Sequence, residues 1–239
     1  MTTPSPTPII ELKNLIFAWP KQATLLDIDE FRLEPGHSLF LKGPSGSGKT
    51  TLLGLLGGVQ LAQSGSIHLL GQDLSTLSAS ARDRFRVDHS GFIFQQFNLL
   101  PFLSVTDNVL LPCQFSKHRK QRAIERHGSI QNAAQALLLQ LGLTEELHQQ
   151  LAGELSIGQQ QRVAAARALI GQPKLVIADE PTSALDADSR EAFLHLLFAE
   201  CQAAGASLLF VSHDQSLAKL FDHSIDLSQL NRATRKQEI

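Results

Sequence analysis

A glycine-rich segment, "GPSGSGKT" at residues 43–50, limits what this chain can fold into more than any other feature of its sequence. It follows a short apolar stretch, "SLFLK" (38–42), and precedes a helix-forming run from residue 50 to about residue 61. The glycines let the backbone curl so that several N–H groups point at one phosphate, and the helix start that follows favours an anion. A strand, a glycine loop and a helix in this order therefore predict a phosphate-binding loop.

The loop also predicts particular contacts. Lys49 is expected to reach the β- and γ-phosphates of a nucleotide, and the hydroxyl of Thr50 to bind Mg²⁺. The residues expected to hold the phosphates are Gly43, Pro44, Ser45, Gly46, Ser47, Gly48, Lys49, Thr50 and Thr51.

A second chemical element is "LVIADE" (175–180), an apolar strand that ends in two acids. Asp179 would lie at the carboxyl edge of the sheet, beside the glycine loop, where it can hold Mg²⁺. Glu180 can act as general base toward an attacking water. A charge pair at the start of a helix is the alternative interpretation of these two residues.

Lone polar residues follow two further apolar stretches. Gln95 comes after "GFIF" (91–94), and His213 comes after "SLLFVS" (207–212). Both would emerge on the same sheet edge as Asp179, where Gln95 can reach the metal and the water and His213 can donate to a γ-phosphate. Plain surface or core positions remain the alternative for both.

The segment "LSIGQ" (155–159) is a second helix start suited to a phosphate. Ser156 is expected at the N-cap, and Gln159 completes a capping box. Ser156 offers a hydroxyl and Gly158 an unhindered N–H at the positive end of the helix. The chain thus carries two phosphate-seeking helix starts that lie far apart in the sequence.

Composition and periodicity bound the fold class. The 239 residues are 43% hydrophobic and carry a net charge of −2, so no global basic field indicates nucleic-acid binding. Cys113 and Cys201 lack metal or disulfide spacing, which favours a reducing compartment. No secretory signal is expected at the N-terminus, and the apolar run at 51–62 is too short to cross a membrane.

The expected strands are 9–19, 25–33, 38–42, 66–70, 91–94, 174–179 and 207–212. Helices are expected near 50–61, 79–88 and 188–204, and residues 104–170 show only helical periodicity.

This pattern predicts an α/β sheet domain interrupted by a helical insertion. Within the insertion, "KHRKQRAIERH" (117–127) is strongly basic. It is interpreted either as a solvated helix face or as a surface that faces lipid headgroups or a membrane partner.

Taken together, the motifs closely resemble those of the ATP-binding cassette (ABC) ATPases, over roughly Ile9 to Leu227 and in the family's order. "GPSGSGKT" resembles the Walker A loop, Gln95 the Q-loop residue, "LSIGQ" the signature, "LVIADE" the Walker B strand and His213 the switch histidine. Asp186 ends a segment similar to the D-loop, "SALD" (183–186), and is expected to contact the nucleotide. Trp19 stands where the family places an aromatic ring on adenine. Ile157 departs from the signature, which usually has glycine there.

The resemblance implies a P-loop sheet core with an antiparallel β subdomain and an inserted helical subdomain at about 96–170. The expected organisation is a flexible tail at 1–8, one ABC ATPase domain at 9–230 and a C-terminal tail at 231–239. The resemblance also implies ATP and Mg²⁺ as ligands and a head-to-tail homodimer, in which each signature (Ser156, Gly158, Gln159) caps the γ-phosphate held by the other copy. If Ile157 needs positive φ it would be costly; otherwise its side chain can point elsewhere.

Two longer stretches, 91–112 and 159–189, resemble the branch of lipoprotein-release, macrolide-export and cell-division ATPases of bacteria. This implies a subunit at the cytoplasmic face of the inner membrane that drives a separate permease, gripped near 96–112 by Phe97, Leu99, Leu100 and Phe102. Neither nucleic acid nor the transported substrate is expected to contact the chain. The alternatives are a DNA-repair or chromosome-type ABC ATPase, which needs long coiled coils, and a regulatory module that binds ATP without turnover.

Overall fold

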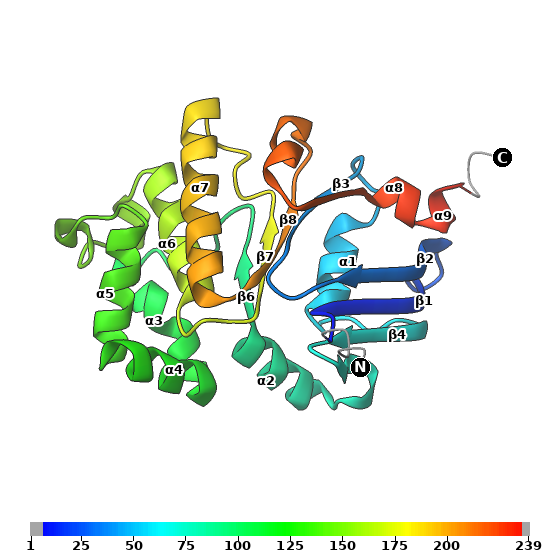
Figure 1. The fold of residues 1–239 in the computed structure, drawn as a ribbon, viewed down its shortest axis with the longest axis horizontal. Coiled ribbons are helices and arrows are strands. Elements are labelled where there is room, and N and C mark those ends of the chain that lie inside the picture. The colour runs from blue at the N-terminus through cyan, green and yellow to red at the C-terminus, as the bar shows by residue number, and fades with distance from the viewer. Residues whose placement is uncertain (1–6, 236–239) are drawn as a thin grey trace, which may run out of the picture. The chain divides into compact units, whose positions relative to one another are not determined.

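The computed structural model describes residues 7–235 (Figure 1). Most of the tail expected at 1–8 and the end of the tail expected at 231–239 lie outside these described residues. The chain divides into two compact units, the first formed by the residues up to Arg86 together with those from Ser207 onward, and the second by Val87–Ala206. The expected division into one domain at 9–230 with a helical subdomain at 96–170 remains a prediction.

The first unit contains an antiparallel sheet of strand order β2-β1-β4-β5. Along β1 and β2, side chains that point to the core, such as Leu12, Ile28 and Phe31, alternate in part with exposed ones, as expected of a sheet that is buried on one face. The strands are β1 (Ile10–Ala18), β2 (Thr24–Leu33), β4 (Ser64–Leu69) and β5 (Gln72–Asp73), followed by the short helix η1 (Leu74–Thr76). The antiparallel β subdomain implied by the resemblance is therefore present.

The same unit holds a parallel set in which β3 (Ser38–Lys42) pairs with both β8 (Ser207–Val211) and β9 (His223–Asp226). The apolar residues of β3 and β8 are almost completely buried, which explains why both strands could be predicted as continuous apolar runs. β9 was not predicted, because its sequence "HSID" carries polar residues and too few apolar ones. Between β8 and β9 lies the helix η4 (Gln215–Leu220).

Helix α1 (Lys49–Leu56) follows β3 and ends earlier than the expected position near residue 61. Gly57 and Gly58 follow its last residue, and Gly58 has φ 64°. A left-handed glycine is a common way to end a helix, and here it outweighs the apolar residues that continue beyond it.

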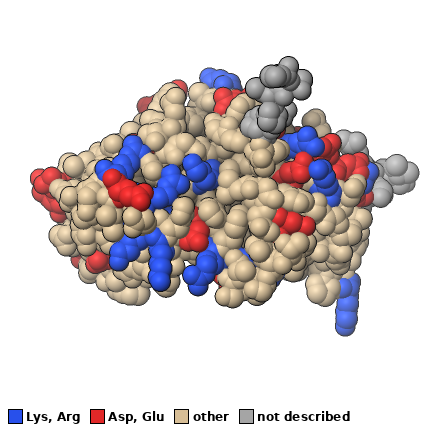
Figure 2. All heavy atoms as spheres, turned by 60° about the horizontal axis from the view of Figure 1, so that its bottom comes forward, with Lys and Arg blue, Asp and Glu red and all other residues tan. Residues whose placement is uncertain are grey.

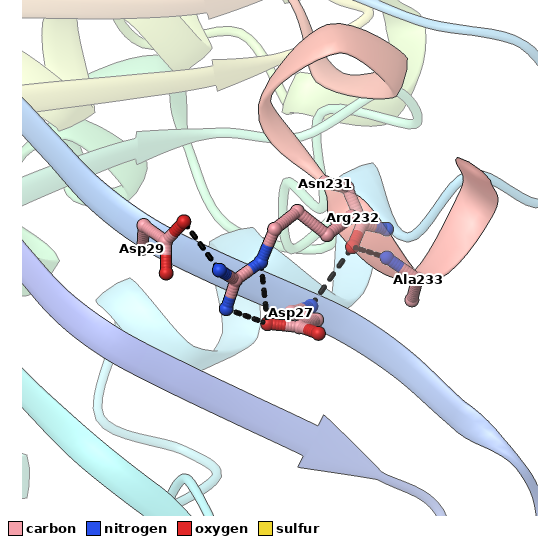
Figure 3. Close-up of polar contacts among 5 residues, drawn as sticks. All are labelled: Asp27, Asp29, Asn231, Arg232 and Ala233. Carbon is pink, nitrogen blue, oxygen red and sulfur yellow. Dashed lines mark hydrogen bonds and ion pairs between the residues drawn. The ribbon is translucent and has the colours of Figure 1, made fainter. Parts of the chain in front are cut away.

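Hydrogen bonds and ion pairs hold Asn231 and Arg232 against β2 (Figure 3). The buried Asn231 accepts hydrogen bonds from Asp27 N–H (2.8 Å) and Ala233 N–H (3.1 Å), and it donates to Leu25 O (2.7 Å). Arg232 pairs with the carboxylates of Asp27 and Asp29. Asn231 is the C-cap of the short helix α8 (Leu227–Leu230), and the short helix α9 (Arg232–Arg235) follows it. The C-terminal tail expected at 231–239 remains a prediction.

Helix α2 (Ala79–His89) leads into the second unit, where β6 (Ser90–Ile93) pairs in parallel with β7 (Leu175–Asp179). The expected insertion is helical throughout its regular parts, and α5 buries one face through Ala133, Ala134 and Leu138. The helices are α3 (Val105–Phe115), α4 (Lys117–His127), α5 (Ile130–Gln140), η2 (Glu145–Leu147), η3 (Ala152–Glu154), α6 (Ile157–Leu169) and α7 (Ala187–Ala204).

The basic segment 117–127 forms α4, and its Arg119 is buried. The Arg119 guanidinium donates to the carbonyls of Ile170 (2.7 Å) and Ala168 (2.6 Å), so it caps the carboxyl end of α6. Burial lowers the pKa of this guanidinium to about 10, which still leaves it charged at neutral pH. Neither interpretation of the segment anticipated that one of its arginines would serve as an internal helix cap.

On the face shown in Figure 2, Lys and Arg side chains are interspersed with acidic and uncharged ones, consistent with the net charge of −2. Within residues 7–235, no helix has both the length and the apolar character needed to span a bilayer.

Candidate active site

The glycine loop has the backbone that its sequence predicts. Gly46 (φ 78°) and Gly48 (φ 98°) are left-handed, and Gly48 is the N-cap of α1. A Cβ atom on Gly48 would lie 2.8 Å from a methyl carbon of Leu26, so both conformation and space require glycine there. The first turn of α1 carries no acid, which leaves the positive end of the helix uncompensated.

Two polar side chains of the loop, those of Lys49 and Ser47, could bond to a phosphate. Lys49 Nζ donates to the carbonyls of Gly43 (2.7 Å) and Pro44 (3.0 Å), which belong to the loop itself. Ser47 is buried, and its Oγ has no hydrogen-bond partner. A buried hydroxyl without a partner costs about 1–3 kcal/mol, so this loop is built for an acceptor from outside the chain. These features define a phosphate-binding loop of the P-loop nucleotide-binding class.

Trp19 and His213 belong to the same unit as the loop. Trp19 begins the turn between β1 and β2, and its 37%-exposed ring packs edge-on against Phe17 at a centroid distance of 5.2 Å. His213 is exposed and follows β8, the parallel neighbour of β3. Because the loop begins where β3 ends, the structure brings His213 and the loop to the same sheet edge, as the sequence predicts.

The second unit gathers the other predicted groups at the carboxyl edge of β6 and β7. Ile93 pairs with Ala178, so Gln95 and Asp179 both lie just beyond this last pair of the two strands. Glu180 follows with φ 47°, a left-handed conformation that costs a non-glycine residue about 1–3 kcal/mol. The Gln161 side chain donates to Pro181 O (2.9 Å) and so supports the backbone directly after Glu180.

Gln95 itself lies in a β-turn that Phe97 N–H closes onto Phe94 O at 2.9 Å. A γ-turn follows directly, with Asn98 N–H bonded to Gln96 O (2.6 Å). Phe97 (φ 59°) and Asn98 (φ 49°) are both left-handed, which costs about 1–3 kcal/mol for each residue. Neither conformation was predicted from the sequence, although asparagine tolerates the left-handed region.

The predicted capping box at the start of α6 is confirmed. Ser156 Oγ accepts from Gln159 N–H (3.3 Å), and Gln159 Oε1 accepts from Ser156 N–H (2.9 Å). The Ser156 hydroxyl keeps its own hydrogen for donation. Ile157 is the first helical residue, has no positive φ and is 54% exposed, so it does not strain the backbone.

Asp186 has a use within its own chain. Its carboxylate is the N-cap of α7 and accepts from Ser189 N–H and from the Ser189 hydroxyl, both at 2.9 Å. These hydrogen bonds hold the pKa of Asp186 below its usual value. Its predicted contact with nucleotide stays a prediction.

Comparison with known proteins agrees with this picture. A family model described as "ABC transporter" matches residues 26–183. The uncharacterized ABC transporter ATP-binding protein YbbA of Escherichia coli is 38% identical over 216 residues, which cover 90% of this chain and 91% of YbbA. The macrolide export ATP-binding/permease protein MacB of Shigella flexneri is 38% identical over 225 residues, which are 92% of this chain but 33% of MacB. The chain thus spans about a third of the length of MacB.

Among solved structures, the dimeric post-hydrolysis state of the ATP-binding cassette MJ0796 bound to ADP and Pi superposes with a TM-score of 0.75. It is 31% identical and the match covers 94% of this chain and 95% of MJ0796. The chain belongs to the ABC transporter family. Its fold and motifs are those of an ATP-binding cassette ATPase, which confirms the fold class and the resemblance.

Proposed function

We propose that two copies of this chain pair head to tail around two ATP molecules and hydrolyse them to drive a membrane permease. The observation that carries the proposal is Gly158, the second residue of α6. It has no positive φ, and a Cβ atom on it would meet nothing within 4 Å inside its own chain. Glycine in a helix costs about 1 kcal/mol relative to alanine, so a gain outside the chain must explain it.

A nucleotide held by the partner copy supplies that gain. At the start of α6, the N–H groups of the first turn have no carbonyl partner within the helix, and the helix dipole favours an anion. A bare Gly158 lets a phosphate approach these groups closely, while the Ser156 hydroxyl donates to it. The similarity to MJ0796, which was solved as a dimer bound to ADP and Pi, supports a nucleotide-bound dimer for this chain.

In the proposed site, each side chain has one task. Lys49 exchanges its bonds to the loop carbonyls for phosphate oxygens, and Ser47 gains the partner it lacks. The Trp19 ring stacks on adenine. Glu180 accepts a proton from the attacking water, and His213 donates to the γ-phosphate as charge builds up there.

The residues present also fit a magnesium ion. The Thr50 hydroxyl, the Gln95 amide oxygen and the Asp179 carboxylate are hard oxygen donors, which Mg²⁺ prefers, and Gln95 and Asp179 follow paired strands. When bound, Mg²⁺ neutralises charge on the β- and γ-phosphates. In the proposed site, the task of these three residues would be to hold the magnesium ion.

We further propose that the permease grips residues 96–112. Phe102 is 70% exposed and Leu100 is 37% exposed, whereas Phe97 is buried and Leu99 half-buried. Exposed apolar side chains so close to Gln95 suit a partner helix. The proposed location is peripheral, at the cytoplasmic face of the membrane, through this permease. The chromosome-type alternative is disfavoured, because α2–α5 have 11 residues each and offer no coiled-coil arm.

Substitution of Gly158 tests the proposal. Gly158→Ala is expected to keep or raise the free energy of unfolding, because alanine favours the helix and meets no clash, yet to lower ATP turnover about tenfold or more by blocking the phosphate. The measurements are urea unfolding and steady-state phosphate release.

Gly205→Ala is the matched control. Gly205 also has open space around its Cβ position, but its φ is 60° at the carboxyl end of α7. This variant is expected to lose about 1 kcal/mol of stability and to keep its turnover. Wild-type turnover by Gly158→Ala would remove the main support for the proposed dimer.

A further inference from the structure

Arg167, near the carboxyl end of α6, makes contacts that the proposed mechanism does not use. Its Nη1 donates to Asn98 O at 2.6 Å and its Nη2 donates to Phe97 O at 2.5 Å. Burial lowers the pKa of this guanidinium, and within residues 7–235 it forms no ion pair. A half-buried cation is therefore bonded to two neutral carbonyls of consecutive residues.

The geometry of these carbonyls explains the need for arginine. Phe97 and Asn98 are the two left-handed residues of the turn that follows Gln95. A backbone in this conformation persists only where its surroundings over-determine it. The planar fork of a guanidinium can bind two adjacent acceptors in a fixed orientation, whereas the ammonium of lysine is a point charge on a flexible stem. The Phe97 side chain is also buried, which helps to hold the same turn.

The position of Gln95 depends on this turn. Gln95 lies two residues before Phe97, within the β-turn that Phe97 N–H closes. Arg167 itself lies on the helix whose other end carries Ser156 and Gly158. The fork thus joins the Gln95 segment to a rigid helix of 13 residues, about 20 Å long at 1.5 Å per residue.

We propose that Arg167 is a positioning residue for Gln95, acting through the carbonyls of Phe97 and Asn98 to hold the Gln95 amide where the metal and the water bind. This rests on the role given to Gln95 in the proposed function. Helix α6 then has two roles: its amino end presents the signature residues, and Arg167 near its carboxyl end positions the Gln95 segment.

A double-mutant cycle between Arg167 and Gln95 tests this proposal. Arg167→Met and Gln95→Ala are each expected to lower kcat per folded chain about tenfold or more, because misplacing a positioned group by about 1 Å has effects of this size. Both are expected to raise the Mg²⁺ concentration needed for half-maximal turnover and to leave the affinity for a fluorescent ATP analogue within about twofold. The double variant is expected to be no more than about twofold slower than Gln95→Ala.

Arg162→Met is the matched control, since Arg162 lies on the same helix and also donates to the carbonyls of two consecutive residues, Leu141 and Gly142, which lie outside the Gln95 segment. Its effect is expected on stability, and any effect on kcat should multiply with that of Gln95→Ala. If Arg167→Met does not fold, Arg167→Lys enters the same cycle, with the same non-additivity and Mg²⁺ shift expected.

The outcomes distinguish a failure of the role proposed for Arg167 from a failure of the role proposed for Gln95. If Gln95→Ala is slow and Arg167→Met multiplies its effect without moving the Mg²⁺ dependence, the role of Arg167 is overturned and the proposed function stands. If Gln95→Ala turns over at the wild-type rate with the wild-type Mg²⁺ dependence, the role of Gln95 fails, and the role of Arg167 fails with it.

Discussion

The Glu180→Gln variant is expected to bind ATP with wild-type affinity, to hydrolyse it about 10²–10⁴ times more slowly and to accumulate as a dimer. The amide keeps the shape of the carboxylate but cannot accept the proton of the attacking water. Binding is expected to remain intact because, in the proposed dimer, the phosphate contacts come from the glycine loop and from the partner's signature. The ATP that joins two copies is then not consumed, and the dimer persists.

Size-exclusion chromatography with Mg-ATP, combined with light scattering, measures this mass, and phosphate release measures the rate. Glu125→Gln on α4 is a suitable control, because Glu125 is exposed and bonded to Gln121 on the same helix. It should turn over normally and show no stable dimer. A Glu180→Gln variant that keeps full turnover, or that stays monomeric with saturating ATP, would refute the assigned role.

Lys49→Ala is expected to lose nucleotide affinity by about a hundredfold or more, since removing one partner of a buried charged contact costs about 2–5 kcal/mol. Lys49 Nζ lies within the glycine loop, where a phosphate would bind, and donates to Gly43 O at 2.7 Å. Titration with a fluorescent ATP analogue measures the loss.

Lys42→Ala is the matched control for this titration. Lys42 precedes the loop, and its Nζ lies 3.9 Å from an Asp226 carboxylate oxygen. Its removal is expected to change the affinity by no more than about threefold, because a partly exposed ion pair contributes little. Equal affinities for Lys49→Ala and wild type would show that Lys49 does not contact the nucleotide.

Features set by neighbouring residues could be predicted from the sequence. The glycine loop, the capping box of Ser156 and Gln159, and the polar residues after β6, β7 and β8 each depend on a few consecutive residues with known conformational preferences. The fold class followed, because strands and helices alternate with clear periodicity.

Features set by distant partners could not be predicted. Arg119, Arg167 and Asn231 all bond to backbone groups far away in the sequence, and no local pattern distinguishes them from solvated polar residues. The left-handed Phe97 has no glycine to indicate it, since burial of its ring and the fork of Arg167 hold it. Asn98 tolerates this conformation, so it was the one local signal available.

In the proposed function, each ATPase site is formed by two copies of the chain, with one half from each copy. Turnover per chain and molecular mass are to be measured on the same dilution series with Mg-ATP. Turnover per chain is expected to fall as dilution separates the copies, in proportion to the loss of dimer. Constant turnover by a species with the mass of a single chain, about 26.1 kDa, would contradict it.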